Sequence, residues 1–108
     1  MQKKTVNILG TEYTLYLDET NDDNPEIKKR QCAGYCNIAT KEIHIGDFSK
    51  SDAPELERSE TLRHELLHAF ITESGLGNEC PWAFNEEMID WFAIQMPKLR
   101  KTFDELGV

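Results

Sequence analysis

The hydrophobic pattern of this 108-residue chain changes period once, near Gly46, and this change constrains the fold most strongly. Before Gly46, apolar residues alternate with polar neighbours, as strands with one buried face require. After it, apolar residues recur every three or four positions, which is typical of amphipathic helices. A chain of this length forms a single domain. We therefore expect one α+β domain over residues 1–108, with the sheet first and the helices after it.

The first half predicts a small antiparallel sheet of three or four strands. Its expected segments are a hairpin over 5–17 that turns at Gly10-Thr11, a loop over 18–30, and further strands over 34–36 and 42–45.

The second half predicts three helices. Ser51 or Asp52 is expected to cap the first, which has Pro54 in its first turn, and Gly75 is expected to follow its end. Pro97 lacks a backbone N–H and is expected to break the helical pattern that follows. The remaining expected segments are a loop over 75–81, a second helix over 82–95 and a short C-terminal helix over 98–106.

Charge and cysteine content limit the partners and the compartment. The net charge is −8, from 12 Lys and Arg against 20 Asp and Glu, and no basic face for a nucleic acid or an anionic membrane is visible. No apolar run is long enough for a membrane span or a secretory leader. Three cysteines, an odd number, argue against a disulfide framework. We expect a cytoplasmic protein without nucleic-acid or membrane partners.

One motif in the helical half points to metal chemistry. Residues 64–68 are His-Glu-Leu-Leu-His. The i, i+4 spacing places His64 and His68 one turn apart on one helical face, where both imidazoles can bind one zinc ion. Glu65 is expected to be the general base that takes a proton from zinc-activated water. Apolar neighbours make these groups costly there unless they are paired with one another or bind a metal.

A catalytic zinc site needs a third protein ligand, and the second helix offers one. Glu86 and Asp90 are four residues apart and share one helical face. We expect Glu86 to be the third ligand and Asp90 to accept a hydrogen bond from one of the two histidines. Glu87, one position round the helix, is the alternative ligand, and helical phase disfavours it.

These motifs resemble those of known peptidases. The H-E-x-x-H motif, followed by Asn85, Glu86 and Asp90, is similar to the gluzincin pattern of thermolysin-like zinc peptidases. Residues 86–97, EEMIDWFAIQMP, also resemble the ImmA/IrrE family, and small acidic chains of this kind resemble short prophage proteins. The resemblance spans roughly residues 31–97.

The resemblance implies a minimal zincin-like fold that hydrolyses a peptide or protein substrate, and a phage or prophage origin. It implies Zn²⁺ bound by His64, His68 and Glu86, with Glu65 as the catalytic residue. Larger gluzincins also supply a histidine or tyrosine that stabilises the oxyanion. The candidates for that role here are Tyr35 and His44; His44 is also an alternative metal ligand or simply an exposed strand residue.

Three interpretations follow, in decreasing order of preference. The first is a small zinc peptidase whose substrate lies extended along the edge strand near residues 34–45. The second is a zinc-binding interaction module with weak or no turnover, favoured by the lack of an evident oxyanion donor. The third is a structural metal site in which Cys80, or Cys32 with Cys36, supplies thiolate ligands.

Overall fold

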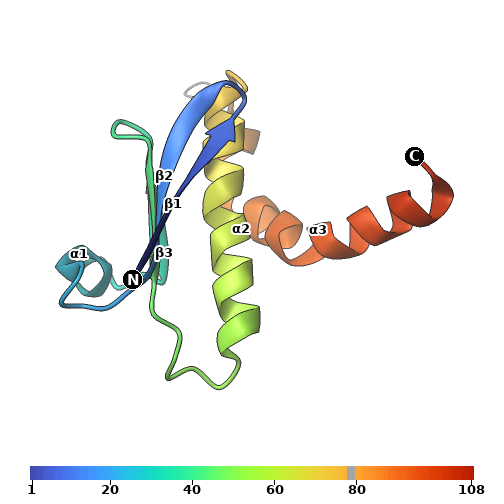
Figure 1. Ribbon diagram of the computed structural model, residues 1–108. Helices are drawn as coiled ribbons and strands as arrows, with labels where there is room; N and C mark the ends of the chain where they lie inside the picture. The colour runs from blue at the N-terminus through green and yellow to red at the C-terminus, as the bar shows by residue number, and fades with distance from the viewer. Residues whose placement is uncertain (78–79) are drawn as a thin grey trace.

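The computed structural model describes residues 1–77 and 80–108, and the α+β expectation is confirmed (Figure 1). The elements in chain order are β1 (Gln2–Ile8), β2 (Thr11–Glu19), α1 (Pro25–Lys29), β3 (Gly34–Asn37), β4 (Glu42–Gly46), α2 (Pro54–Glu73), the 3-10 helix η1 (Pro81–Phe84) and α3 (Glu86–Leu106).

The sheet has four strands in the order β1-β2-β4-β3, and it is mixed. The pairs β1–β2 and β3–β4 are antiparallel, whereas β2 and β4 are parallel. The prediction of a wholly antiparallel sheet is therefore wrong. Parallel neighbours need a long connection, and residues 20–41 supply one because they cross over through α1 and then form the edge strand β3.

Two local predictions in the first half are corrected. The β1–β2 turn consists of Leu9 and Gly10, both left-handed with φ of 50° and 94°, so it begins one residue earlier than expected. The segment predicted as a loop over 18–30 contains the end of β2 and all of α1. Asn24 caps α1 by accepting a hydrogen bond from the Glu26 backbone N–H.

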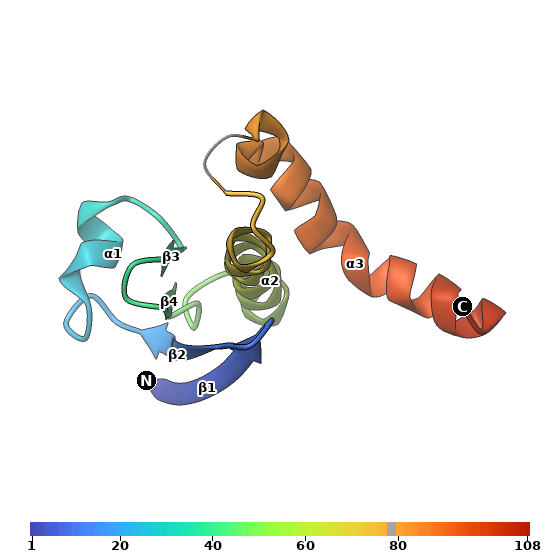
Figure 2. The ribbon, with the colours of Figure 1, turned by 90° about the horizontal axis from the view of Figure 1, so that it is seen from above.

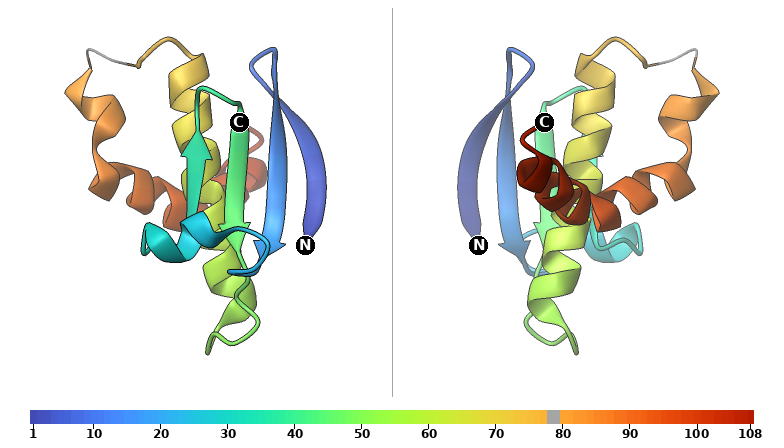
Figure 3. Two further views of the ribbon diagram at one scale, coloured as in Figure 1. Left: turned by 90° about the vertical axis from the view of Figure 1, so that its left-hand side faces the viewer. Right: turned by 90° about the vertical axis from the view of Figure 1, so that its right-hand side faces the viewer.

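Helix α2 covers one face of the sheet, and α1 lies on the other side (Figure 3). The main core lies between the sheet and α2 because the strands alternate and send their apolar side chains to that face. Its fully or almost fully buried residues are Ile8, Tyr13, Leu15, Leu17, Ile43, Ile45 and Ala69. This packing holds α2, and the motif it carries, against the strands β3 and β4.

The ends of α2 show which capping predictions hold. Ala53 is the N-cap and provides no side-chain cap, so the prediction of Ser51 or Asp52 as the cap is wrong. The Ser51 hydroxyl instead accepts a hydrogen bond from the Ala53 backbone N–H at 3.0 Å. The predicted end is confirmed, since Ser74 is the C-cap and Gly75 is left-handed. The predicted loop over 75–81 includes residues 78 and 79, which lie outside the described residues.

Helix α3 runs unbroken through Pro97, so the prediction of two separate helices is wrong. Pro97 cannot donate to the carbonyl of Ala93, four residues earlier. Arg63 of α2 donates to this carbonyl through its Nε instead. The helix therefore continues because a side chain from another element replaces the missing donor.

The C-terminal half of α3 extends away from the sheet and from α2 (Figures 1 and 2). Within residues 1–77 and 80–108, no helix combines the length and the apolar character that crossing a membrane requires.

Candidate metal centre

Helix α2 places two histidines side by side. His64 and His68 lie in the middle of the helix, one turn apart, and their ring centroids are 4.9 Å apart. Their Nε2 atoms face each other at 3.1 Å. Both rings are half-buried beside the sheet, so a positive charge between them would be only partly screened by water.

Glu86, the first residue of α3, completes the group. Asn85 fixes this end of the helix because its side chain accepts a hydrogen bond from the Met88 backbone N–H at 2.9 Å. The Glu86 carboxylate then lies 2.9 Å from His64 Nε2 and 3.2 Å from His68 Nε2. We call His64, His68 and Glu86 the metal group.

The donor set of the metal group fits a metal ion. Its three ligand atoms lie within 4.8 Å of one another, and no other such group of three occurs among the described residues. Ligand atoms bound tetrahedrally to zinc are about 3.3 Å apart, given zinc–ligand bonds of about 2.0–2.1 Å. The observed separations need only small adjustments. Glu87, the alternative ligand, is not part of the group.

Asp90 orients one of the ligands. Its Oδ1 lies 2.6 Å from His64 Nδ1, one turn along α3 from Glu86. A carboxylate at this nitrogen holds the proton on Nδ1 and leaves the lone pair of Nε2 free toward the metal group. The structure therefore places Asp90 where the sequence predicted a histidine partner, and it assigns that partner to His64.

Glu65 lies beside the metal group and is only 8% exposed. The pKa of its carboxyl is raised to about 7, mainly by burial, while His64 lowers it and the nearby Glu86 and Asp90 add to the increase. Within residues 1–77 and 80–108, its carboxylate forms no hydrogen bond or ion pair, and it lines both hollows beside the metal group. Burial also lowers the pKa of His68 despite the adjacent Glu86, which favours the neutral imidazole that binds metal.

A hollow of about 310 Å³ lies between the metal group and the edge strand β3. Gly34 is the point of closest approach, because a Cβ there would lie 2.7 Å from the His44 carbonyl oxygen and 3.2 Å from Thr61 Cγ2. Only glycine lets this strand pass so close to its neighbours. Because β3 is the last strand of the sheet, its outer backbone edge has no strand partner among the described residues and lies beside the metal group.

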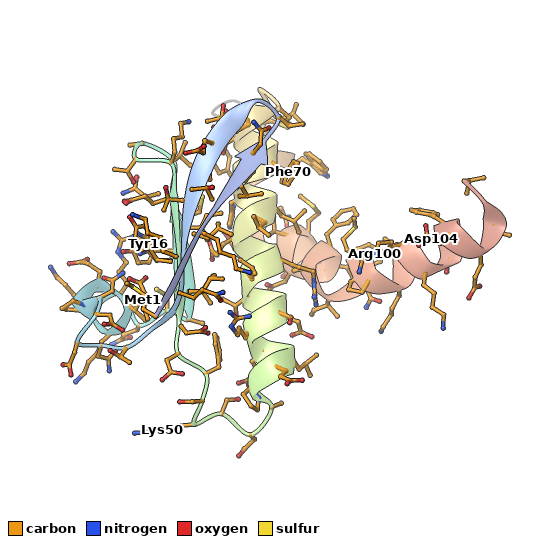
Figure 4. The ribbon with its side chains drawn as sticks, in the orientation of Figure 1. Met1, Tyr16, Lys50, Phe70, Arg100 and Asp104 are labelled. Carbon is orange, nitrogen blue, oxygen red and sulfur yellow. The ribbon has the colours of Figure 1, made fainter. Side chains whose placement is uncertain are left out.

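The structure does not bring Tyr35 or His44 to the metal group. Both rings stand on the sheet face away from α2, stacked with centroids 4.7 Å apart, and Tyr16 marks this face in Figure 4. The alternation of β4 already carried this information, because Ile43 and Ile45 point to the core and so turn His44 outward. Neither ring therefore reaches the metal group, although Tyr35 contributes to the lining of the hollow beside it. His44 is a strand residue, as one alternative held, but it is half-buried and not exposed.

Cysteines do not join the metal group among the described residues. Burial raises the pKa of the Cys36 thiol to about 12, which disfavours the thiolate that a zinc ligand requires. The interpretation as a cysteine-ligated structural site thus loses its main support.

One residue of importance here was missed by the sequence analysis. Arg63 ties α2 to α3 at the Ala93 carbonyl and so fixes the helix that delivers Glu86. Pro97 was the available signal, since it frees that carbonyl and implies that another donor must satisfy it.

No protein-family model, curated protein or solved structure matches this chain.

Proposed function

We propose that this protein is a zinc-dependent metallopeptidase with a minimal zincin-like fold. The observation that carries the proposal is the convergence of His64, His68 and Glu86 on one point, with the buried carboxylate of Glu65 beside it. Two neutral nitrogens and one carboxylate oxygen are a ligand set that catalytic zinc uses, with a fourth position left for water or substrate.

Each residue of the proposed site has a separate task. Bound zinc would supply a Lewis acid that activates water and polarises a peptide carbonyl. Glu65 takes the proton from the attacking water and passes it to the departing amine. A pKa raised toward neutrality suits both steps, since the group must accept and then release a proton. Asp90 keeps His64 in the tautomer that binds the metal.

The edge of β3 is the proposed place for the substrate. An extended peptide can add to this edge through backbone hydrogen bonds and so reach the hollow beside the metal group. Backbone pairing requires no particular side chains, so this contact positions the peptide without selecting its sequence. The resemblance to the gluzincins and to the ImmA/IrrE family, including its phage members, supports the same proposal from the motifs alone.

A second function has one observation in its favour. The rings of Tyr35 and His44 stack on the other face of the sheet, so neither ring offers an oxyanion donor at the metal group, although Tyr35 lines the hollow beside it. A zinc-binding interaction module with weak or no turnover needs no such donor. In that case Glu65 would be dispensable for the biological effect, whereas His64 would be required.

Metal content is the first test. We expect about one zinc per chain in the wild type and in Glu65→Gln, measured by elemental analysis after purification without added metal. The zinc should be lost in His64→Ala and weakened in Glu86→Gln. Glu87→Gln is the matched control, since it makes the same change one position along α3. Loss of zinc from Glu87→Gln and not from Glu86→Gln would disprove the ligand assignment.

Hydrolysis separates the two functions. Zinc-loaded wild type should cleave peptides in a mixture analysed by mass spectrometry, and Glu65→Gln should lose this activity about 100-fold or more while keeping its zinc. Equal, absent cleavage in both zinc-loaded proteins would favour the interaction module.

A further inference from the structure

A second hollow adjoins the metal group and has no role in the chemistry described above. It has a volume of about 500 Å³ and shares Gly34, His64 and Glu65 with the hollow beside β3. From there it extends along the N-terminal half of α2, reaching Glu57. A peptide that enters the metal group along β3 would therefore have this second hollow next to it.

Negative charge dominates this second hollow. Glu57 and Glu60 of α2 and Asp90 of α3 line it together with Glu65, and no lysine or arginine does so among the described residues. Arg63 is next in sequence to His64, but its guanidinium binds the Ala93 carbonyl.

Two carboxylates of this hollow make no direct polar contact. The half-buried Glu60 and the 8%-exposed Glu65 form no hydrogen bond or ion pair within the described part of the chain, although His64 also lines the hollow. Glu57 accepts a hydrogen bond from the neutral Ser51 hydroxyl. Several negative groups that face one cavity without compensation repel each other, and a bound cation would relieve this repulsion.

The wall of the hollow also has an apolar part. Phe48, Ala93 and Ile94 contribute it alongside the carboxylates. Lysine and arginine side chains combine an apolar stem with a charged end, so the stem can lie on this wall while the end reaches the carboxylates. An acidic side chain would meet charges of its own sign, and a purely apolar one would leave the carboxylates unpaired.

We propose that this hollow, which we call the acidic hollow, binds a lysine or arginine side chain of the substrate close to the bond that is cleaved. The inference rests on the proposed peptidase function for its meaning, because it names the class of peptide that the metal group would act on. Charge and wall chemistry select the residue, while the backbone edge of β3 holds the chain.

Peptide binding to the zinc-free wild type tests the proposal without cleavage, because this protein keeps all four carboxylates of the acidic hollow. Labelled peptides that differ only in one central residue, Lys, Ala or Glu, are titrated by fluorescence anisotropy at physiological ionic strength. We expect the Lys peptide to bind about tenfold more tightly than the Ala peptide, as a charged hydrogen bond implies, and the Glu peptide to bind most weakly. Equal affinity for all three peptides, or no binding, overturns the proposal.

A charge-matched pair of variants excludes general attraction to an acidic protein. Glu60→Gln and Glu55→Gln remove the same charge from α2, but Glu60 lines the acidic hollow and Glu55 is exposed outside it. We expect Glu60→Gln to abolish most of the preference for the Lys peptide and Glu55→Gln to keep it. An equal loss in both variants would show that net charge alone attracts basic peptides, and the acidic hollow would have no specific role.

Cleavage by the zinc-loaded wild type separates this inference from the proposed function. Cleavage next to lysine or arginine supports both. Cleavage next to neutral residues overturns the assignment of the acidic hollow and leaves the peptidase intact. Selective binding of the Lys peptide with no cleavage supports the ligand class and argues against the peptidase.

Discussion

His44 and His64 each place their Nδ1 atom against a carboxylate, on opposite sides of the sheet, but their other contacts differ. His44 Nδ1 lies 2.7 Å from the buried Glu19, and its ring is stacked between Tyr16 and Tyr35. His64 Nδ1 lies 2.6 Å from Asp90, but its Nε2 faces the Nε2 of another histidine and a carboxylate.

The two histidines differ in whether the polar groups around them satisfy one another. Around His44, the buried Glu19 carboxylate also receives a hydrogen bond from Asn24, so the polar groups satisfy one another. Around His64, imidazole nitrogens and a carboxylate converge in an arrangement that could hold a cation. We call His44, Glu19 and Asn24 the His44 group. We infer that the His44 group stabilises the fold and that the metal group serves the proposed reaction.

The largest expected effects come from replacing one histidine on each side of the comparison by alanine. His44→Ala removes the main partner of buried Glu19 and should lower the free energy of unfolding of the zinc-free protein by about 3 kcal/mol. Zinc content of the folded fraction should stay unchanged. His68→Ala should do the reverse, losing zinc with a much smaller effect on the zinc-free protein. Urea unfolding and elemental analysis of both variants make the check, and zinc loss in His44→Ala would break the distinction.

A smaller effect is expected where α2 holds α3. Arg63→Met keeps most of the aliphatic stem but leaves the Ala93 carbonyl without its donor, so stability should fall by about 1–2 kcal/mol. Zinc affinity should fall as well, because α3 carries Glu86. Urea unfolding and zinc titration give the two values.

Pro97→Ala supplies the matched control for Arg63. It restores a backbone N–H that can satisfy the Ala93 carbonyl within the helix, so Arg63→Met should cost less on this background than in the wild type. A double-mutant cycle measures this coupling. Strict additivity of the two substitutions would show that Arg63 does not replace the donor that Pro97 lacks.

The features that could be predicted from the sequence are those determined by residues close together in the chain. The end of α2 at Glu73 and the pairing of His64 with His68 follow from residues close in sequence, and both were predicted. The parallel pairing of β2 with β4 was not predicted. Alternation indicates which face of a strand is buried, but not which strand pairs with it.

Distance in sequence explains why the continuity of α3 was not predicted. The continuity of α3 through Pro97 depends on Arg63, thirty residues before Ala93, and no local pattern reports such a contact. For His44, the alternation of β4 is enough to choose between the alternatives, because it turns this residue to the face opposite the core.

Glu73, at the end of α2, is a carboxylate whose surroundings differ from those of Glu65 on the same helix, and acid pH tests this difference. Glu73 accepts hydrogen bonds from Lys41, Tyr13 and Thr11, which lower its pKa from 4.5 to about 2. Because the folded pKa is depressed, its stabilising effect is fully present above about pH 4.5 and is lost as the pH falls toward 2.

Glu73→Gln checks this pH dependence. The variant should be less stable than the wild type at neutral pH, and the difference should shrink as the pH falls through the same range. Urea midpoints measured at a series of pH values give the two curves. Glu55→Gln, an exposed change on the same helix, should leave the pH profile as it is. A constant difference between Glu73→Gln and wild type would contradict the assignment.

The smallest expected effect tests whether zinc uptake depends on overall stability. Leu9 is 59% exposed and holds a left-handed φ of 50°, a conformation that costs leucine about 1 kcal/mol and that asparagine tolerates. Leu9→Asn should therefore raise stability by about 0.5–1 kcal/mol, while Leu76→Asn, an exposed change without positive φ, should not. Zinc affinity should be the same in both variants. If Leu9→Asn tightened zinc binding, the metal group would report the stability of the sheet, and its separation from the His44 group would fail.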